Sequence, residues 1–364
     1  MELVIVGGGI AGLTCAVAAE RAMPQARITL LERAPATTPV GAGIVLWPNA
    51  LAVLDRIGVS TEVLTAAGAP VASAGIRTSG GRWLRRGDAA QLHRQLGRTV
   101  ALHRADLVEI LLSRLTRTEV QLGAEVTQVD LDGTVRWSGP GGERTLTADV
   151  VAAADGLRSS VRHRHWGVAP KPAGVICLRA VVDVPAQEFV ETWGRGEIVG
   201  QVPIGAGRTY VYAARRAPWD GADLDWARSW PTLAPGLVEA VGATSTDLII
   251  GELASLPAVT PWTKGRVALL GDAAHAMLPF LGQGACQGIE GAGALIDTIA
   301  SGTDLRVYEE RRRARAMMVH RASQQASQVA MAGGALAVVR DAVVPLIPDR
   351  AFAAQLARLT TPIG

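Results

Sequence analysis

The chain has 364 residues, of which 49% are hydrophobic and 19% are charged. This apolar fraction supports a large core and excludes disordered and fibrous classes, and the length allows roughly two domains of ~150 residues. The net charge is only +3, which disfavours a nucleic-acid-binding protein. Three widely separated cysteines support neither a disulfide framework nor a cysteine zinc site. This cysteine usage favours a reducing, cytoplasmic location.

The N-terminal segment has a pattern typical of a parallel sheet. The apolar runs 3–6 and 28–31 predict strands, and the Ala-rich segment 13–22 between them predicts a helix that ends before Pro24. This order indicates a βαβ unit. Farther along the chain, the sequence predicts helices over 48–57 and 105–115, hairpins around 80–81 and 138–143, and a buried strand over 149–154.

The middle of the chain changes in character. Between residues 171 and 262, strand-like runs alternate with turns rich in Pro, Gly and Trp, which predicts an antiparallel sheet. The longest apolar stretches are interrupted by Pro, Gly or Gln, so no membrane span is expected. A strand over 266–270 and helices over 285–300, 305–329 and the C-terminal tail complete the predicted elements. The predicted domains are a cofactor domain of residues 1–70, 99–170 and 263–302, a β-rich substrate domain of 71–98 and 171–262, and C-terminal helices over 303–364.

A glycine-rich turn joins the first strand to the first helix. Gly7, Gly9 and Gly12 fit the G-x-G-x-x-G pattern, in which glycines allow a sharp turn, close approach of a pyrophosphate and tight packing of the helix. The helix N-terminus then presents unpaired N–H groups to phosphates. Glu32 ends the second strand, where an acid can bind an adenosine ribose. This pattern predicts an FAD or NAD site and disfavours a 2′-phosphate.

Two further motifs favour FAD. Asp155 and Gly156 follow one predicted strand, and Asp272 follows another. A carboxylate at a strand end can accept hydrogen bonds from ribityl hydroxyl groups. The segment from Pro279 to Gly284 precedes a helix, whose positive N-terminal end would stabilise an anionic reduced flavin.

With these motifs, the sequence resembles the class A flavoprotein monooxygenases, the group of p-hydroxybenzoate and salicylate hydroxylases. The resemblance covers nearly the whole chain and includes the segments GAGIVLWPNALAVLDRIG, LHRADLVEILL and YEERRRAR. It implies an α/β fold: a Rossmann-like FAD-binding domain, an inserted antiparallel β-sheet substrate domain, and C-terminal helices. The sequence departs from many relatives after Glu290, where Gly291 replaces the usual Asp, so we expect different helix packing there.

The resemblance also implies the cofactor-binding residues. Asp155 and Gly156 would shape both the FAD site and the approach of NADH or NADPH, the implied co-substrate. The residues implied to bind cofactor are Gly7, Gly9, Ala11, Gly12, Glu32, Arg33, Gly43, Arg104, Val126, Asp155, Gly156, Asp272, Pro279, Gly282, Gln283, Gly284 and Ala285.

The implied activity is hydroxylation of a small aromatic or heteroaromatic substrate with NAD(P)H and O2 through a flavin C4a-hydroperoxide. Because the cofactor carries out the difficult step, no catalytic side chain is assigned. Trp193, Tyr210, Tyr212 and Phe280 are the predicted walls of the substrate pocket. No metal site, nucleic-acid partner or membrane partner is expected, and the oligomeric state is left open.

Two other functions stay open on this scaffold. The chain could epoxidise an alkene, or it could bind flavin without catalysis. A plain NAD dehydrogenase is disfavoured because it would not need the Asp155 and Asp272 motifs. His163, His165 and His275 lack Cys or carboxylate partners at metal-ligand spacing, so we interpret them as structural residues.

Overall fold

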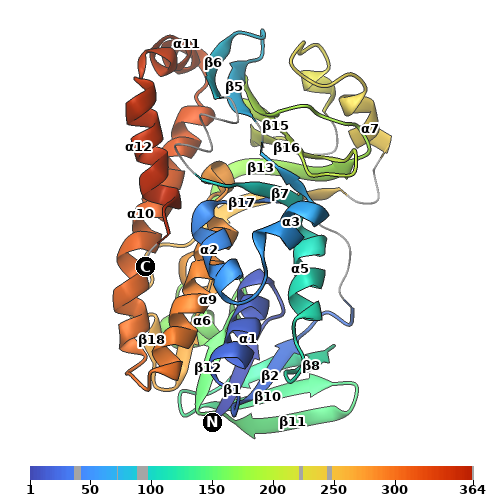
Figure 1. Ribbon diagram of the computed structural model, residues 1–364. Coiled ribbons are helices and arrows are strands. Elements are labelled where there is room, and N and C mark those ends of the chain that lie inside the picture. Colours follow the sequence, from blue (N-terminus) through green and yellow to red (C-terminus); the bar gives the residue numbers. More distant parts are fainter. Residues whose placement is uncertain (37–41, 72, 88–96, 221–223, 244–247, 363–364) are drawn as a thin grey trace.

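The computed structural model describes residues 1–36, 42–71, 73–87, 97–220, 224–243 and 248–362. Two units lie one above the other, and the C-terminal helices run along one side of both (Figure 1). The predicted substrate domain, 71–98 and 171–262, lies partly outside the described residues, so the proposed domain boundaries stay a prediction.

The lower unit in Figure 1 contains a six-stranded sheet in the order β18-β19-β12-β1-β2-β8. β1 pairs in parallel with β2 and β12, while β8 and β19 extend the parallel arrangement and β18 pairs antiparallel at the edge. The predicted βαβ unit is therefore confirmed. The strand bounds are β1 Glu2–Val6, β2 Arg27–Glu32, β8 Glu119–Leu122, β12 Val150–Ala153, β18 Thr263–Lys264 and β19 Val267–Leu269.

Two helices pack closely around the glycine turn at the end of β1 because small residues lie at their contacts. A Cβ atom on Gly12 of α1 (Ile10–Ala22) would lie 1.9 Å from the Gly7 carbonyl oxygen. A Cβ atom on Gly288 of α9 (Gly284–Ala300) would lie 3.2 Å from the Ala11 Cβ. Larger side chains would force these elements apart. The other helices of this unit are α2 Pro48–Arg56, α3 Thr61–Ala67, α5 Arg104–Ser113, α6 Ser160–Trp166 and α8 Asp272–His275.

The upper unit contains a seven-stranded sheet in the order β17-β13-β16-β15-β14-β5-β6. The predicted antiparallel character holds for most pairs, but β14 pairs with β5 in parallel. The predicted hairpin around 80–81 is confirmed as β5 and β6. One face packs against α7 (Leu237–Ala243) and a group of tryptophans. The strand bounds are β5 Ala74–Thr78, β6 Trp83–Gly87, β13 Lys171–Val182, β14 Phe189–Trp193, β15 Glu197–Pro203, β16 Thr209–Arg216 and β17 Ile249–Ser255.

Two small sheets complete the fold. The first, β11-β10-β9, contains the predicted second hairpin, and the second, β3-β7-β4, was not expected from the sequence. The β3 strand meets the large antiparallel sheet directly, because a Cβ atom on Gly43 would lie 2.4 Å from the Tyr210 Cβ. The second small sheet therefore joins the two units. Its strands are β3 Gly43–Leu46, β4 Ala69–Pro70 and β7 Val100–His103, and the first has β9 Glu125–Val129, β10 Thr134–Gly139 and β11 Gly142–Thr147.

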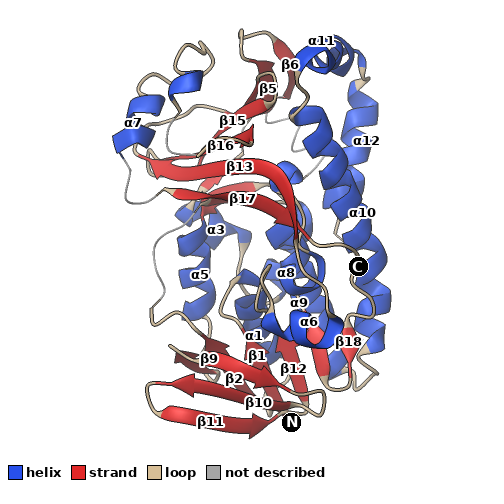
Figure 2. Cartoon of the chain, turned by 180° about the vertical axis from the view of Figure 1, so that it is seen from behind, coloured by secondary structure: helices blue, strands red, loops and turns tan. Residues whose placement is uncertain are grey.

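The C-terminal helices run along both units (Figure 2). The helix predicted over 305–329 is observed as α10 (Arg306–Ala330), followed by α11 (Gly334–Val343) and α12 (Asp349–Thr360). Among the described residues no single helix has the length and apolarity to cross a membrane. The pair α10 and Gly334–Leu346 meets those criteria together, with a bend of 109° between them.

Candidate FAD and substrate site

The cofactor motifs meet at one edge of the parallel sheet. Gly7 follows β1, Glu32 ends β2, Asp155 follows β12, and Asp272 follows β19. These four strands are parallel neighbours, so their carboxyl ends lie at the same edge. In open α/β sheets this edge is where ligands bind. The fold thus brings together motifs that are separated by more than 200 residues in the sequence.

The glycine turn has the geometry of a phosphate cradle. Gly7 has φ +105°, a conformation that strongly favours glycine, and a Cβ atom there would lie 2.4 Å from the Ala154 carbonyl oxygen. At Gly9, by contrast, an added Cβ would meet no described heavy atom within 4 Å. No described side chain caps the N-terminus of α1. The helix end therefore presents N–H groups to open space beside Gly9, which fits a pyrophosphate.

Glu32 lies against this turn. Its Oε2 accepts a hydrogen bond from the Gly8 N–H at 2.6 Å, and its Oε1 accepts one from the Ala34 N–H at 2.8 Å. The carboxylate is thereby fixed beside the glycine turn, the position from which an acid binds an adenosine ribose. Arg33 is exposed next to it.

Asp272 and Arg104 form the charged part of the site. Asp272, the first residue of α8, is exposed to solvent, yet desolvation raises its pKa, while Arg104 and Arg162 act in the opposite direction. Arg104 begins α5, and desolvation lowers its pKa against the opposing effects of Asp272 and Glu32. Asp272, Arg104 and Glu32, which come from separate elements, are therefore close enough to interact electrostatically.

The Asp155 loop is held by a buried arginine. Asp155 Oδ2 accepts a hydrogen bond from the Val161 N–H at 3.2 Å, while its Oδ1 has no partner among the described residues. Arg162 is 1% exposed and donates to the carbonyl oxygens of Leu157 at 2.7 Å and Ala273 at 3.2 Å. Arg162 thus ties the Asp155 loop to the Asp272 helix. Sequence reasoning did not assign this role to Arg162.

The segment before α9 has a second uncapped helix N-terminus. A short 3₁₀ turn, Pro279–Leu281, leads to Gly282, whose φ is +60°. No described side chain caps α9, and an added Cβ on Gly284 would meet no described atom within 4 Å. The Gln283 side chain accepts a hydrogen bond from Asn49 Nδ2 at 3.1 Å, but its buried Nε2 has no described partner. These groups can bind a polar ligand edge, and Ala285 lies partly buried behind them.

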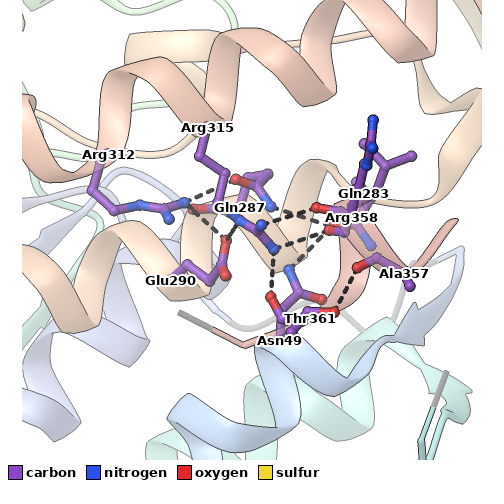
Figure 3. A network of polar contacts seen from close by, with 10 residues as sticks. Asn49, Gln283, Gln287, Glu290, Arg312, Arg315, Ala357, Arg358 and Thr361 are labelled. Carbon is purple, nitrogen blue, oxygen red and sulfur yellow. Dashed lines mark hydrogen bonds and ion pairs between the residues drawn. The ribbon is translucent and has the colours of Figure 1, made fainter. Parts of the chain in front are cut away.

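A buried ion pair anchors α9 behind this segment. Glu290 Oε2 lies 3.0 Å from Arg312 Nη2 and 3.3 Å from Arg315 Nε, both on α10 (Figure 3). The next residue is Gly291, where an added Cβ would lie 3.2 Å from Leu270 Cδ1. The glycine therefore allows close packing of α9 on the segment after β19. The departure at this position is therefore a packing feature, about two helical turns after Gly284.

Three of the expected cofactor residues have additional or different contacts. Ala11 packs between Gly271 and Gly288, where small size is required. Gly43 lies against Tyr210. Val126 is on β9 and is partly buried against the core of the lower unit. Their contact with FAD stays a prediction, as it does for the other residues implied by resemblance.

The expected substrate-pocket residues fall into two groups. Trp193, Tyr212 and Phe280 share one apolar cluster, which brings the large sheet against the Pro279–Leu281 turn. Tyr210 lies on the same sheet at the junction with Gly43, in a neighbouring cluster that also includes Tyr212, and the centroids of the two rings are 5.5 Å apart. The sequence missed Glu191, whose carboxyl group accepts hydrogen bonds from both Trp193 and Tyr212.

The histidines and cysteines have structural surroundings. Among the described residues no group of three or more His, Cys, Asp or Glu side chains could hold a metal. Burial lowers the pKa of His275 to about 3, and its ring packs 5.2 Å from that of Trp262. Burial raises the pKa of Cys286 to about 12, so its thiol is a poor nucleophile at neutral pH.

Together, the glycine turn, the ribose acid, the accessible Asp272 and the uncapped α9 define a Rossmann-like flavoprotein that binds FAD. A family model described as an FAD binding domain matches residues 1–323. The chain belongs to this family and is an FAD-dependent monooxygenase of the aromatic hydroxylase type, in the class A group.

Individual relatives cover most or all of the chain. Aurachin C monooxygenase/isomerase of Stigmatella aurantiaca is 34% identical over 308 residues, 80% of this chain and 79% of the relative. The 2-heptyl-3-hydroxy-4(1H)-quinolone synthase of Pseudomonas aeruginosa strain PAO1 is 30% identical over 403 residues, covering 100% and 99%. A crystal structure of Klebsiella pneumoniae HpxO complexed with FAD and uric acid has a TM-score of 0.86 at 24% identity, covering 100% of this chain and 98% of that one. The fold is thus that of the FAD-dependent hydroxylases.

Proposed function

We propose that this protein uses NAD(P)H and O2 to hydroxylate a small, electron-rich nitrogen heteroaromatic substrate. One observation carries the proposal. The cofactor motifs meet at the carboxyl edge of the parallel sheet, where Arg104 is close enough to Asp272 and Glu32 to interact with both electrostatically, and the turn before α9 contributes Leu278 and Phe280 to the apolar cluster that contains Trp193 and Tyr212. Such a site could bind a flavin at the sheet edge and a flat ring against the neighbouring apolar cluster.

Each part of the site would have a separate task. The glycine turn and Glu32 would hold the adenosine half of FAD, while Asp272 would accept hydrogen bonds from the ribityl chain. When bound, FAD would accept electrons from the nicotinamide and activate O2 for transfer of one oxygen atom to the substrate ring. The N-terminus of α9 would stabilise negative charge on the cofactor. The apolar cluster around Trp193 and Phe280 would exclude water and orient the substrate.

The relatives support a nitrogen heteroaromatic substrate. The names of two of them include a quinolone and urate, both nitrogen heterocycles. Oxygen transfer requires an electron-rich ring carbon, a property that such rings share with phenols.

The nicotinamide co-substrate would bind transiently near Asp155 and Gly156. In the part of the chain that the structure describes, one strand–turn–helix has the dinucleotide pattern, and the proposal assigns it to FAD. Reduction should then depend on substrate, provided that substrate binds the reducible and reactive arrangements with different affinity. Stopped-flow reduction should be faster with substrate than without it. Equal rates together with tight NAD(P)H binding would indicate a reductase with a dedicated nucleotide site.

A substrate screen tests the proposed reaction. The purified protein should bind FAD, and a true substrate should stimulate NAD(P)H oxidation and gain one oxygen atom derived from ¹⁸O₂. Formation of hydrogen peroxide without a hydroxylated product from any phenol or nitrogen heterocycle would contradict the proposal. An epoxide product from an alkene would replace hydroxylation with the alternative left open above.

A further inference from the structure

The substrate-facing side of the large sheet carries one continuous row of polar and aromatic residues. Arg179 on β13 pairs with Tyr212 on β16, which pairs with Gly200 on β15, which in turn pairs with Glu191 on β14. Directly paired residues place their side chains on the same face of a sheet. These four positions therefore lie side by side across four adjacent strands.

Gly200 allows Tyr212 to lie across the row. A Cβ atom at Gly200 would be 2.0 Å from the Tyr212 Cζ and 2.2 Å from its Cε1. Any side chain at this position would displace the ring. Because the ring lies over Gly200, the Tyr212 hydroxyl reaches Glu191 two strands away and donates a hydrogen bond to Oε1.

Glu191 is held from both sides. Tyr212 donates to Oε1, and Trp193 Nε1 donates to Oε2 at 2.9 Å. Desolvation raises the Glu191 pKa, and these two hydrogen bonds oppose the rise. The residue nevertheless is only half-buried, so it retains accessible surface. An ionised carboxylate can accept about four hydrogen bonds, which leaves capacity for a ligand donor.

The same face lies toward the turn before α9. Trp193 and Tyr212 share an apolar cluster with Leu278 and Phe280, which flank the turn before α9. On the other side of Tyr212, Arg179 is close enough to contribute to the electrostatics of Arg104. Glu191 thus belongs to the wall against which a substrate ring would lie, and it brings an acid where the surrounding cluster is apolar.

We propose that Glu191, oriented by Tyr212 and Trp193, selects substrates whose ring presents an N–H or O–H donor and rejects substrates with a carboxylate at this end. This inference rests on the proposed function and names its substrate class. A ring donor would satisfy a free acceptor site of the carboxyl group. An aromatic carboxylate would instead meet the half-buried Glu191 carboxyl group beside Gly200, which supplies no cation, while Arg179 lies on the far side of Tyr212.

The test measures binding of matched probes to the FAD-loaded enzyme through changes in the flavin spectrum. One pair is 4-quinolone and 1-methyl-4-quinolone, which differ in the N–H donor. A second pair is 1-naphthol and its methyl ether, which differ in the O–H donor, and 4-quinolone-2-carboxylate adds the acid. At least one donor probe should bind about tenfold or more tightly than its methylated partner, and the carboxylate should bind less tightly than 4-quinolone.

Ratios of dissociation constants measured in variants test whether Glu191 causes this discrimination. Glu191→Gln should reduce the ratio of dissociation constants to about threefold or less, and Tyr212→Phe should reduce it in part because the carboxyl group is less well oriented. Glu188→Gln is the matched control, since Glu188 lies just before β14 and pairs with Arg77 and Arg86. A structural role alone would lower the melting temperature of Glu191→Gln without changing the ratio.

The possible failures are distinguishable. The inference is wrong if wild type does not discriminate within either pair, if Glu191→Gln keeps the wild-type ratio, if the carboxylate binds best, or if no probe binds. Turnover measures the proposed function separately. Hydroxylation of both members of a pair with equal affinity would leave the proposed function intact and overturn the inference about Glu191.

Discussion

Replacing Arg104 should weaken FAD binding without unfolding the protein. The residue begins α5, its side chain is exposed, and both Asp272 and Glu32 are near enough to favour its charged form. If Arg104 binds the cofactor, Arg104→Ala removes a charge-assisted hydrogen bond and leaves two carboxylates beside an anionic ligand. Both effects act in the same direction.

The magnitude follows from the type of bond and its exposure. Hydrogen bonds to charged groups contribute about 1.5–3 kcal/mol, and the exposed side chain places Arg104 at the lower end of this range. A loss of about 1.5 kcal/mol corresponds to roughly a tenfold higher dissociation constant for FAD. Repulsion from Asp272 and Glu32 would add to this value. Arg104→Lys should fall between wild type and Arg104→Ala because it keeps the charge but loses the planar fork.

Isothermal titration of the apoprotein with FAD measures this effect, and the melting temperature of the apoprotein checks the fold. Arg114→Ala is the matched control because it lies at the opposite end of the same helix and is exposed. An FAD dissociation constant equal to that of wild type would refute the assignment of Arg104 as a cofactor anchor.

Three further predictions concern packing and burial. Gly12→Ala should abolish FAD binding and lower the melting temperature, because the added Cβ would lie 1.9 Å from the Gly7 carbonyl oxygen. A stable variant that still binds FAD would contradict this packing. Asp272→Asn should weaken FAD binding. It should also stabilise the apoprotein at pH values above the ordinary carboxyl pKa, because the raised pKa of Asp272 means that its ionisation opposes folding. Denaturation of wild-type and variant apoprotein at pH 5 and pH 8 should show the larger stabilisation at pH 8. For His275, the pKa near 3 means that the unfolded chain binds the extra proton, so stability should fall by about 2 kcal/mol from pH 7 to pH 5. His275→Phe should flatten this pH dependence, and an unchanged slope would show that other groups cause it.

Local patterns were sufficient to predict the cofactor unit. The apolar run of β1, the glycine turn, the Ala-rich helix and Glu32 lie within about thirty residues, so each signal is set by its neighbours in sequence. The sequence also predicted that Asp155 and Asp272 each follow a strand, because short buried apolar runs precede both residues.

The face of the large sheet that carries Glu191 and Tyr212, the proposed substrate wall, could not be predicted in the same way. Glu191 lies in a short strand whose importance depends on the register of β14, β15 and β16 together. A sequence alone does not show that Gly200 is the residue over which Tyr212 reaches this acid. The parallel pairing of β14 with β5 was likewise missed, because these strands are separated by more than 100 residues.

Helix α10 has a consequence for how this enzyme could be altered. Near its start, Arg312 and Arg315 hold α9 through Glu290, and near its end, Arg216 of the large sheet donates to the Met331 carbonyl. A single continuous helix therefore acts as a fixed spacer between α9 and the large sheet. We expect the depth of the active site to be nearly constant, so that selection for new substrates would proceed by exchanging individual wall side chains rather than by changing the separation of the two units.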